Sequence, residues 1–149
     1  MFRLTFKKKE RLTSKKTFDL LFNSGRSFTV APFRLVWMDL SHNSPSALPT
    51  FAFRSATQRE GGKGQGTPAP VQLGISVTKR SFPKAVYRNT LKRRIREAYR
   101  KNKHLLYEVL HKKNLSIALM VIYIGKEESH YQEIEKKMIV SLRMLTERM

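Results

Sequence analysis

The 149-residue chain contains no cysteine. Disulfides, thiolate metal sites and cysteine nucleophiles are therefore excluded, and the composition fits a reducing compartment. No apolar run approaches the ~20 residues that a membrane-spanning helix needs. The first nine residues include four basic side chains and lack the apolar stretch of a signal peptide. These absences predict a soluble, cytoplasmic protein with a single domain spanning residues 1–149.

Acidic residues are also scarce, with 11 Asp and Glu against 30 Lys and Arg, so that the formal net charge is +19. A compact chain with this charge repels itself, which favours a polyanionic partner. Nucleic acid is the first candidate and an anionic membrane surface the second. The few carboxylates are not paired at a useful spacing, and the four histidines are scattered (His42, His104, His111 and His130). We therefore predict no catalytic side chain and no metal site in the protein itself.

The positive charge is concentrated in two segments. Residues 1–16 hold seven basic groups and one acid, and residues 84–103 hold nine basic groups and one acid. Residues 125–149 hold five of each sign. We therefore expect one electropositive region, formed by a flexible basic arm over residues 1–12 and by the 84–103 segment.

Hydrophobic periodicity predicts helices and strands in the order α-β-β-β-α-β-α. A helix should begin at Thr13 or Ser14 and end at Gly25. The strand expected over residues 27–38 changes phase at Pro32, which indicates an edge strand or a bulge. The other expected elements are a short strand at 50–54, a strand at 71–78, a helix at 84–103, a buried strand at 116–124 and a helix from 127 to the end. Residues 41–70 form a loop insertion, rich in Gly and Pro in its second half.

The last predicted helix has a narrow apolar stripe (Tyr131, Ile134, Met138, Leu142, Leu145 and Met149). This stripe could bind a partner or a membrane, but packing against the sheet is the favoured interpretation. The balanced charge of the helix also argues against an anionic membrane.

The 84–103 helix has an apolar side and a cationic side. At 100° per residue, one stripe contains Tyr87, Leu91, Ile95, Ala98 and Leu105, and the opposite face contains Arg88, Asn89, Lys92, Arg93, Arg96, Arg100 and Lys103. A solvated helix face usually mixes charges of both signs, but Glu97 is the single acid here. Like charges four residues apart destabilise a helix by a few tenths of a kcal/mol per pair. Contacts with phosphates would compensate for this repulsion, and arginine forks suit phosphates.

This helix resembles the arginine-rich helix of the bacterial ribonuclease P protein component, whose pattern is approximately K-x-x-x-R-N-x-x-K-R-x-x-R. The matching residues are Lys84, Arg88, Asn89, Lys92, Arg93 and Arg96. Residues 11–27 are similar to the opening helix of that family and its terminating glycine, and residues 73–80 to the strand that leads into the arginine-rich helix. Thr90 departs from the pattern, because many members have a third basic residue there. The 41–70 stretch is longer than the usual loop.

The resemblance implies a protein that assists a catalytic RNA in cutting the 5′ leader from precursor tRNA. Its partners would be that RNA and precursor tRNA, without an obligate protein partner or a membrane. The hydrolysis would be carried out by the RNA and by Mg²⁺ bound mainly to the RNA. The resemblance also implies an α+β fold, a two-layer sandwich. In it, the crossover from strand 71–78 to strand 116–124 would be left-handed, against the general right-handed rule.

Two surfaces are implied. The RNA-binding residues would be Lys84, Arg88, Asn89, Lys92, Arg93, Arg96 and Arg100, although Asn89 could instead cap the helix or bond locally. The leader-binding residues would be Phe18, Phe22, Lys79 and Arg80. Aromatic rings suit unpaired nucleotides because every base offers a face for stacking. For Phe18 and Phe22, ordinary core packing remains an alternative.

The main alternative function is that of a ribosomal-type RNA-binding protein without a processing role. A DNA-binding protein is a weaker alternative, since the helix could enter a major groove but nothing indicates a dimer or paired half-sites. A nuclease acting without RNA is weaker still, because clusters of metal ligands are missing from the sequence.

Overall fold

The computed structural model describes residues 5–40 and 70–149, and within them it contains a four-stranded mixed sheet. The strand order is β1-β2-β4-β3, with β1 Arg26–Val30, β2 Phe33–Asp39, β3 Val71–Val77 and β4 Ile117–Tyr123. β1, β2 and β4 pair antiparallel, whereas β3 pairs parallel to β4. The strands predicted at 71–78 and 116–124 are thus confirmed, and β4 is the interior strand that its continuous apolar sequence indicated. The short strand expected at 50–54 lies outside the described residues, as does almost all of the 41–70 insertion.

Residues 27–38 do not form one strand. They form an antiparallel hairpin of β1 and β2 in which Val30 pairs with Phe33, and the two residues between them include a cis Ala31–Pro32 bond. The change of phase at Pro32 therefore marks a turn, not a bulge. A proline fits there because it donates no hydrogen bond to the ladder. The edge position expected for this segment does apply to β1.

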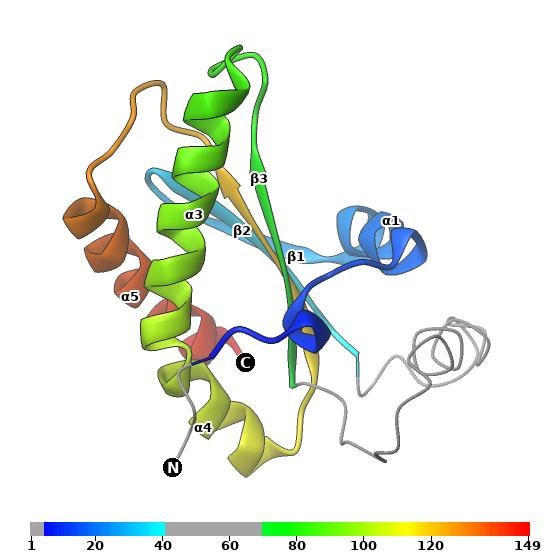
Figure 1. The fold of residues 1–149 in the computed structure, drawn as a ribbon. Coiled ribbons are helices and arrows are strands. Elements are labelled where there is room, and N and C mark those ends of the chain that lie inside the picture. Colours follow the sequence, from blue (N-terminus) through cyan, green and yellow to red (C-terminus); the bar gives the residue numbers. More distant parts are fainter. Residues whose placement is uncertain (1–4, 41–69) are drawn as a thin grey trace.

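Helices cover both faces of the sheet (Figure 1). α1 Lys15–Ser24 lies on one face, and α3 Ala85–Asn102, α4 His104–Lys113 and α5 Tyr131–Arg148 lie on the other. The side chain of Ser14 accepts a hydrogen bond from the Thr17 amide at the start of α1, and Gly25 follows its last residue, as predicted. The connection from β3 through α3 and α4 to the parallel strand β4 is left-handed (Figure 1). None of the described helices is long and apolar enough to cross a membrane.

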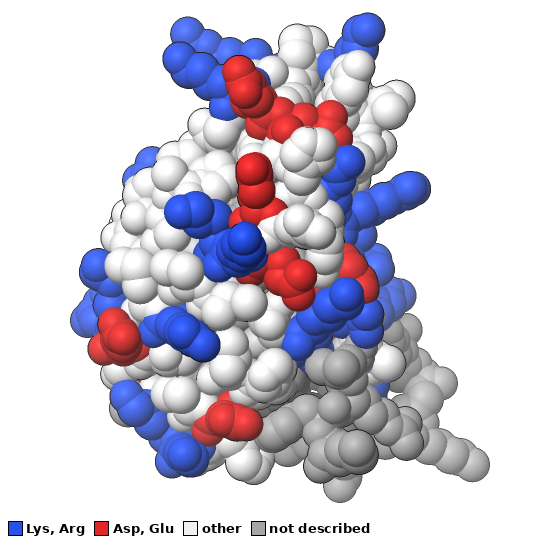
Figure 2. Space-filling model, turned by 90° about the vertical axis from the view of Figure 1, so that its left-hand side faces the viewer, with Lys and Arg blue, Asp and Glu red and all other residues white. Residues whose placement is uncertain are grey.

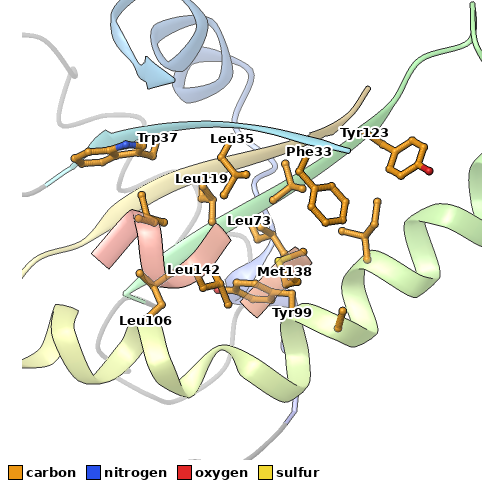
Figure 3. Packing of buried hydrophobic residues seen from close by; sticks show 14 of the residues in the cluster. Phe33, Leu35, Trp37, Leu73, Tyr99, Leu106, Leu119, Tyr123, Met138 and Leu142 are labelled. Atoms are coloured by element: carbon orange, nitrogen blue, oxygen red, sulfur yellow. The ribbon is translucent and has the colours of Figure 1, made fainter. Parts of the chain in front are cut away.

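The main core lies between the sheet and the three helices α3, α4 and α5 (Figure 3). Figure 3 shows strand residues meeting helix residues across this layer, namely Phe33, Leu35, Leu119 and Tyr123 against Tyr99, Leu106, Met138 and Leu142. The apolar stripe of α5 therefore packs inside the protein, as predicted. A smaller core joins Leu21 of α1 to the opposite sheet face (Val36, Met38, Ala118 and Met120).

The basic helix differs from its prediction at both ends. Tyr87 was expected to be buried, but its side chain is 46% exposed because the first turn of α3 extends past the ends of β2 and β4 (Figure 1). At the other end, α3 stops at Asn102 and a separate helix, α4, begins at His104. Leu105 consequently belongs to α4, where Leu106 and Leu110 are the buried residues. Lys103, which was expected on the cationic face, is buried.

The N-terminal segment from residue 5 onward packs on the domain, so the expectation of a flexible arm does not hold for residues 5–12. A short 3₁₀ helix spans Lys8–Glu10, and the Leu12 amide donates to the carbonyl of Leu73 in β3. The attachment depends on Glu10, whose carboxylate forms a buried ion pair with Lys103. That contact was not visible in the sequence because the partners are 93 positions apart.

Candidate nucleic-acid interface

Several cations of α3 are engaged inside the protein. Arg94 donates to the carbonyl of Ser129 at 2.9 Å and pairs with Glu128 at 2.8 Å, which holds the segment before α5. Arg100 forms a two-pronged pair with Glu97 on the same helix. The Lys101 ammonium lies 5.3 Å from the centre of the Tyr131 ring. These three side chains stabilise α3 and its contacts with α5, so Arg100, which was predicted to bind RNA, already has a partner on its own helix.

Arg88 has an internal role as well. One nitrogen of its guanidinium donates to the carbonyls of Phe82 and Pro83, at 2.8 Å in each case. These bonds tie the segment after β3 to the first turn of α3. They fix the position of Lys84, the residue that precedes the helix. Arg88 therefore holds the start of α3 in place, and its half-buried side chain still reaches the surface.

Lys92, Arg93 and Arg96 differ from these residues. Among residues 5–40 and 70–149, no hydrogen bond or ion pair engages their side chains, and the same is true of the side chains of Lys84 and Asn89. Arg93 is exposed, and Lys92 and Arg96 are half-buried. Partial burial lowers the pKa of Arg96, and the nearby charges of Arg11 and Arg93 lower it further. Neighbouring cations without counter-charges repel one another, so they favour the binding of an anion to this surface.

The N-terminal segment joins the positively charged side of α3. The Arg11 guanidinium lies over the Phe6 ring, which packs edge-on against Tyr99 of α3, and the charge of Arg11 contributes to lowering the pKa of Arg96. The neighbouring face of the molecule is different. Figure 2 shows the side of α3 and α5, where Asp and Glu are interspersed with Lys and Arg. A polyanion would therefore meet acidic side chains on that side, and the region around Lys92, Arg93 and Arg96 is the better candidate.

A second candidate surface lies on the side of the sheet that α1 covers. Phe18 and Phe22 of α1 are 39% and 47% exposed, so they are not core residues. Their ring centroids are 4.8 Å apart. Phe18, Leu21 and Phe22 follow one another at helical spacing on one face of α1, and of these three only Leu21 is buried. The two phenylalanines thus form an exposed aromatic pair.

Beyond α1, the same sheet face carries polar groups. Arg34 of β2 pairs in register with Ile122 of β4, which in turn pairs with Ser76 of β3. Arg34 is exposed and Ser76 is half-buried. The sequence contained a signal for Arg34, because it alternates with Phe33 and Leu35 on the strand, but we did not select it. Lys79 and Arg80 are exposed in the turn after β3, at the end of this face where Ser76 lies.

Among the described residues, no three His, Cys, Asp or Glu side chains are grouped so that they could hold a metal ion. The chemistry available at both candidate surfaces is binding, by cationic, amide and aromatic groups.

The family model described as Ribonuclease P matches residues 6–146. The chain belongs to the ribonuclease P protein family. It is 30% identical over 136 residues to the ribonuclease P protein component of Porphyromonas gingivalis strain ATCC 33277, covering 91% of this chain and 82% of that protein. The ribonuclease P protein component of Pseudoalteromonas translucida is 36% identical over 77 residues, or 52% of this chain and 50% of that protein.

Solved ribonuclease P proteins have the same fold. The protein from Staphylococcus aureus has a TM-score of 0.58 at 20% identity, covering 91% of this chain and 94% of that chain. The protein from Thermotoga maritima has a TM-score of 0.58 at 23% identity, covering 91% and 96%. Membership of the family confirms the resemblance seen in the arginine-rich helix and makes the chain a ribonuclease P subunit.

Proposed function

We propose that this subunit assists the catalytic RNA of ribonuclease P in removing the 5′ leader from precursor tRNA in the cytoplasm. Its first task is to bind the catalytic RNA through the exposed side of α3. The observation that carries this proposal is the group formed by Lys92, Arg93 and Arg96, three neighbouring cations whose side chains have no hydrogen-bond or ion-pair partner in the described part of the chain. Lys84 and Asn89 extend the group along the helix. Arg88 adds charge and holds the first turn in place.

The chemistry of this surface is electrostatic. Each phosphate that a Lys or Arg neutralises releases condensed counterions, so affinity falls as salt rises. Arginine can engage a phosphate with two parallel hydrogen bonds, which also fixes orientation. The asparagine offers both a donor and an acceptor to a ribose or a base. Hydrolysis itself is assigned to the RNA and to Mg²⁺ bound mainly by the RNA, and the protein reduces repulsion between RNA phosphates.

The second task is to bind the leader. The exposed pair of Phe18 and Phe22 offers rings on which unpaired bases can stack, at roughly 1–3 kcal/mol per base. Lys79 and Arg80 would contact the leader backbone. Arg34 lies on the same sheet face as α1 and adds a further cation. An unpaired leader needs this combination of aromatic faces and positive charge, whereas a duplex offers its bases less readily.

A ribosomal-type RNA-binding protein would share the cationic helix but would not need the exposed aromatic pair. Competition binding separates these functions. We expect the protein to bind ribonuclease P RNA from the same organism in preference to ribosomal RNA fragments and to duplex DNA of equal length. Equal competition by all three would reduce the protein to a general polyanion binder and would remove the proposed partner.

A further inference from the structure

Glu10 and Lys103 form a buried clasp between the N-terminal segment and the junction of α3 with α4. The Lys103 ammonium lies 2.6 Å from a Glu10 carboxylate oxygen, and the two side chains are 5% and 7% exposed. Lys103 also donates to the carbonyl of Thr5 at 2.5 Å. The Tyr107 hydroxyl and the Lys7 amide donate to the Glu10 carboxylate. Both charges are therefore well satisfied inside the protein.

Such a pair is a poor device for stability alone. Removing two charges from water is costly, and well-packed apolar residues of similar volume often perform as well or better. Separating the two partners would leave a charge buried without a counter-charge, which is strongly unfavourable, so the pair opposes movement of the segments that carry it. Here it fixes the chain up to Glu10 against α3 and α4.

Arg11 follows the clasp directly and is held from its other side as well. It bridges to Leu73 of β3, and the next amide, that of Leu12, donates to the Leu73 carbonyl at 2.9 Å. The Arg11 side chain is exposed, and its guanidinium carbon lies 5.9 Å from the centre of the Phe6 ring. The backbone of Arg11 is thus anchored on both sides, although its side chain lies near the cations of α3.

This placement is electrostatically unfavourable in the free protein. Phe6 links Arg11 to α3, because the Phe6 ring under the Arg11 guanidinium packs edge-on against the ring of Tyr99 in α3, with 6.1 Å between the centroids. The positive charge of Arg11 also contributes to lowering the pKa of Arg96, the direction expected of repulsion between like charges. A segment without anchors would move away from like charge. The clasp and the bridge to β3 prevent that movement. An RNA phosphate between Arg11 and Arg96 would turn the repulsion into a joint attraction.

We propose that Arg11 is an RNA-phosphate contact of the α3 surface, and that the Glu10–Lys103 ion pair is the positioning device that holds it there. This inference rests on the proposed RNA-binding function. It adds to that function a cation from outside the arginine-rich helix and a role for a buried acid in a basic protein.

The test is the salt dependence of binding to ribonuclease P RNA from the same organism, measured with the full-length protein. Each phosphate contact contributes about 0.7–0.9 to the slope of log affinity against log salt. We expect Arg11→Ala to flatten the slope by about one contact. Arg143→Ala, an exposed arginine of α5, is the matched control and should leave the slope unchanged.

Glu10→Gln would leave Lys103 buried without a counter-charge and could prevent folding. The positioning role is therefore tested with Glu10→Met combined with Lys103→Met, with cooperative thermal unfolding as the check on the fold. We expect this folded variant to lose the same one contact as Arg11→Ala. Adding Arg11→Ala to it should flatten the slope no further.

The possible results distinguish failure of the Arg11 contact from failure of the proposed RNA-binding surface on α3. If Arg93→Ala flattens the slope but Arg11→Ala does not, the α3 surface stands and the Arg11 contact is overturned. If Arg11→Ala flattens the slope equally with and without the clasp, the positioning role is overturned. If neither arginine matters, the proposed RNA-binding surface fails together with this inference.

Discussion

Phe18 and Phe22 lie one turn apart on α1 with their ring centroids 4.8 Å apart and their planes inclined by 52°. Both remain exposed, although Leu21, beside them in the sequence, is fully buried. Burial of apolar surface is the dominant favourable contribution to folding, so the part of each ring that stays in water does not add to the stability of this domain. A ligand that covers the two rings would gain the free energy of burying their exposed apolar surface.

Replacing both phenylalanines should therefore affect the substrate more than the fold. We expect Phe18→Ala with Phe22→Ala to weaken binding of leader-bearing precursor tRNA to the protein–RNA complex by roughly 1–3 kcal/mol per stacked base. Binding of mature tRNA, which lacks the leader, should not change. Val140→Ala, at a comparably exposed apolar residue of α5, is the control. An equal loss for both tRNAs would contradict leader stacking.

Arg93 and Arg94 are sequence neighbours with opposite expected roles. Arg93→Ala should flatten the salt slope of RNA binding by about 0.7–0.9, the contribution of one phosphate contact. Arg94→Ala should leave the slope unchanged, because its guanidinium is occupied by Ser129 and Glu128. Arg94→Ala should instead lower the free energy of unfolding, by about 1 kcal/mol or less because the ion pair is partly exposed, and thermal unfolding measures this loss. A flatter slope for Arg94→Ala and an unchanged slope for Arg93→Ala would contradict this prediction and place the RNA on the α5 side of the helix.

The stability of the fold should depend on the ionisation of Glu10. Burial by itself raises the pKa of this carboxyl. Hydrogen bonds from Lys103, Tyr107 and the Lys7 amide together lower it by more, so the folded-state pKa lies below the ordinary 4.5. A lowered folded-state pKa means that the contribution is fully present above the unfolded value and is lost as pH falls below it. We expect the free energy of unfolding to decline in that acidic range. The variant with Glu10→Met and Lys103→Met should show a smaller decline, and an identical decline would contradict this assignment.

Position 25 has no room for a side chain, so we expect it to require glycine. A Cβ atom at this position would lie 2.1 Å from the Leu21 carbonyl oxygen and 2.9 Å from a methyl group of Val36. Because the first neighbour is backbone, Gly25→Ala should destabilise the fold by about 1–3 kcal/mol. Gly74→Ala is the comparison, since its Cβ would meet mainly the flexible end of Met120. Chemical denaturation should show the larger loss at Gly25, and equal losses would contradict the argument.

The elements with strong periodicity could be predicted from the sequence. The stripe of α5 and the continuous apolar run of β4 show which of their own residues are buried, and no knowledge of the packing partner is needed. The hairpin could not be predicted in the same way. A change of phase at Pro32 is compatible with a bulge or with a turn, and the choice depends on which strand pairs with β2.

Long-range contacts limited the prediction of the candidate site. The helical projection placed Lys103 with the other cations of α3, because Glu10 was not visible as its partner. It also could not show that Arg100 is engaged by Glu97 or that Arg88 holds the carbonyls of Phe82 and Pro83. Charge and spacing predicted a cationic side of α3, whereas the individual roles of its cations depend on which acids and carbonyls the fold brings near.

The most direct test of the central claim is reconstitution with ribonuclease P RNA from the same organism at a Mg²⁺ concentration where that RNA alone cleaves poorly. We predict that adding the protein restores removal of the 5′ leader from precursor tRNA, and that Arg93→Ala with Arg96→Ala weakens the rescue while the protein stays folded. Tight RNA binding without any gain in cleavage would contradict the account and leave a general RNA-binding protein with this fold.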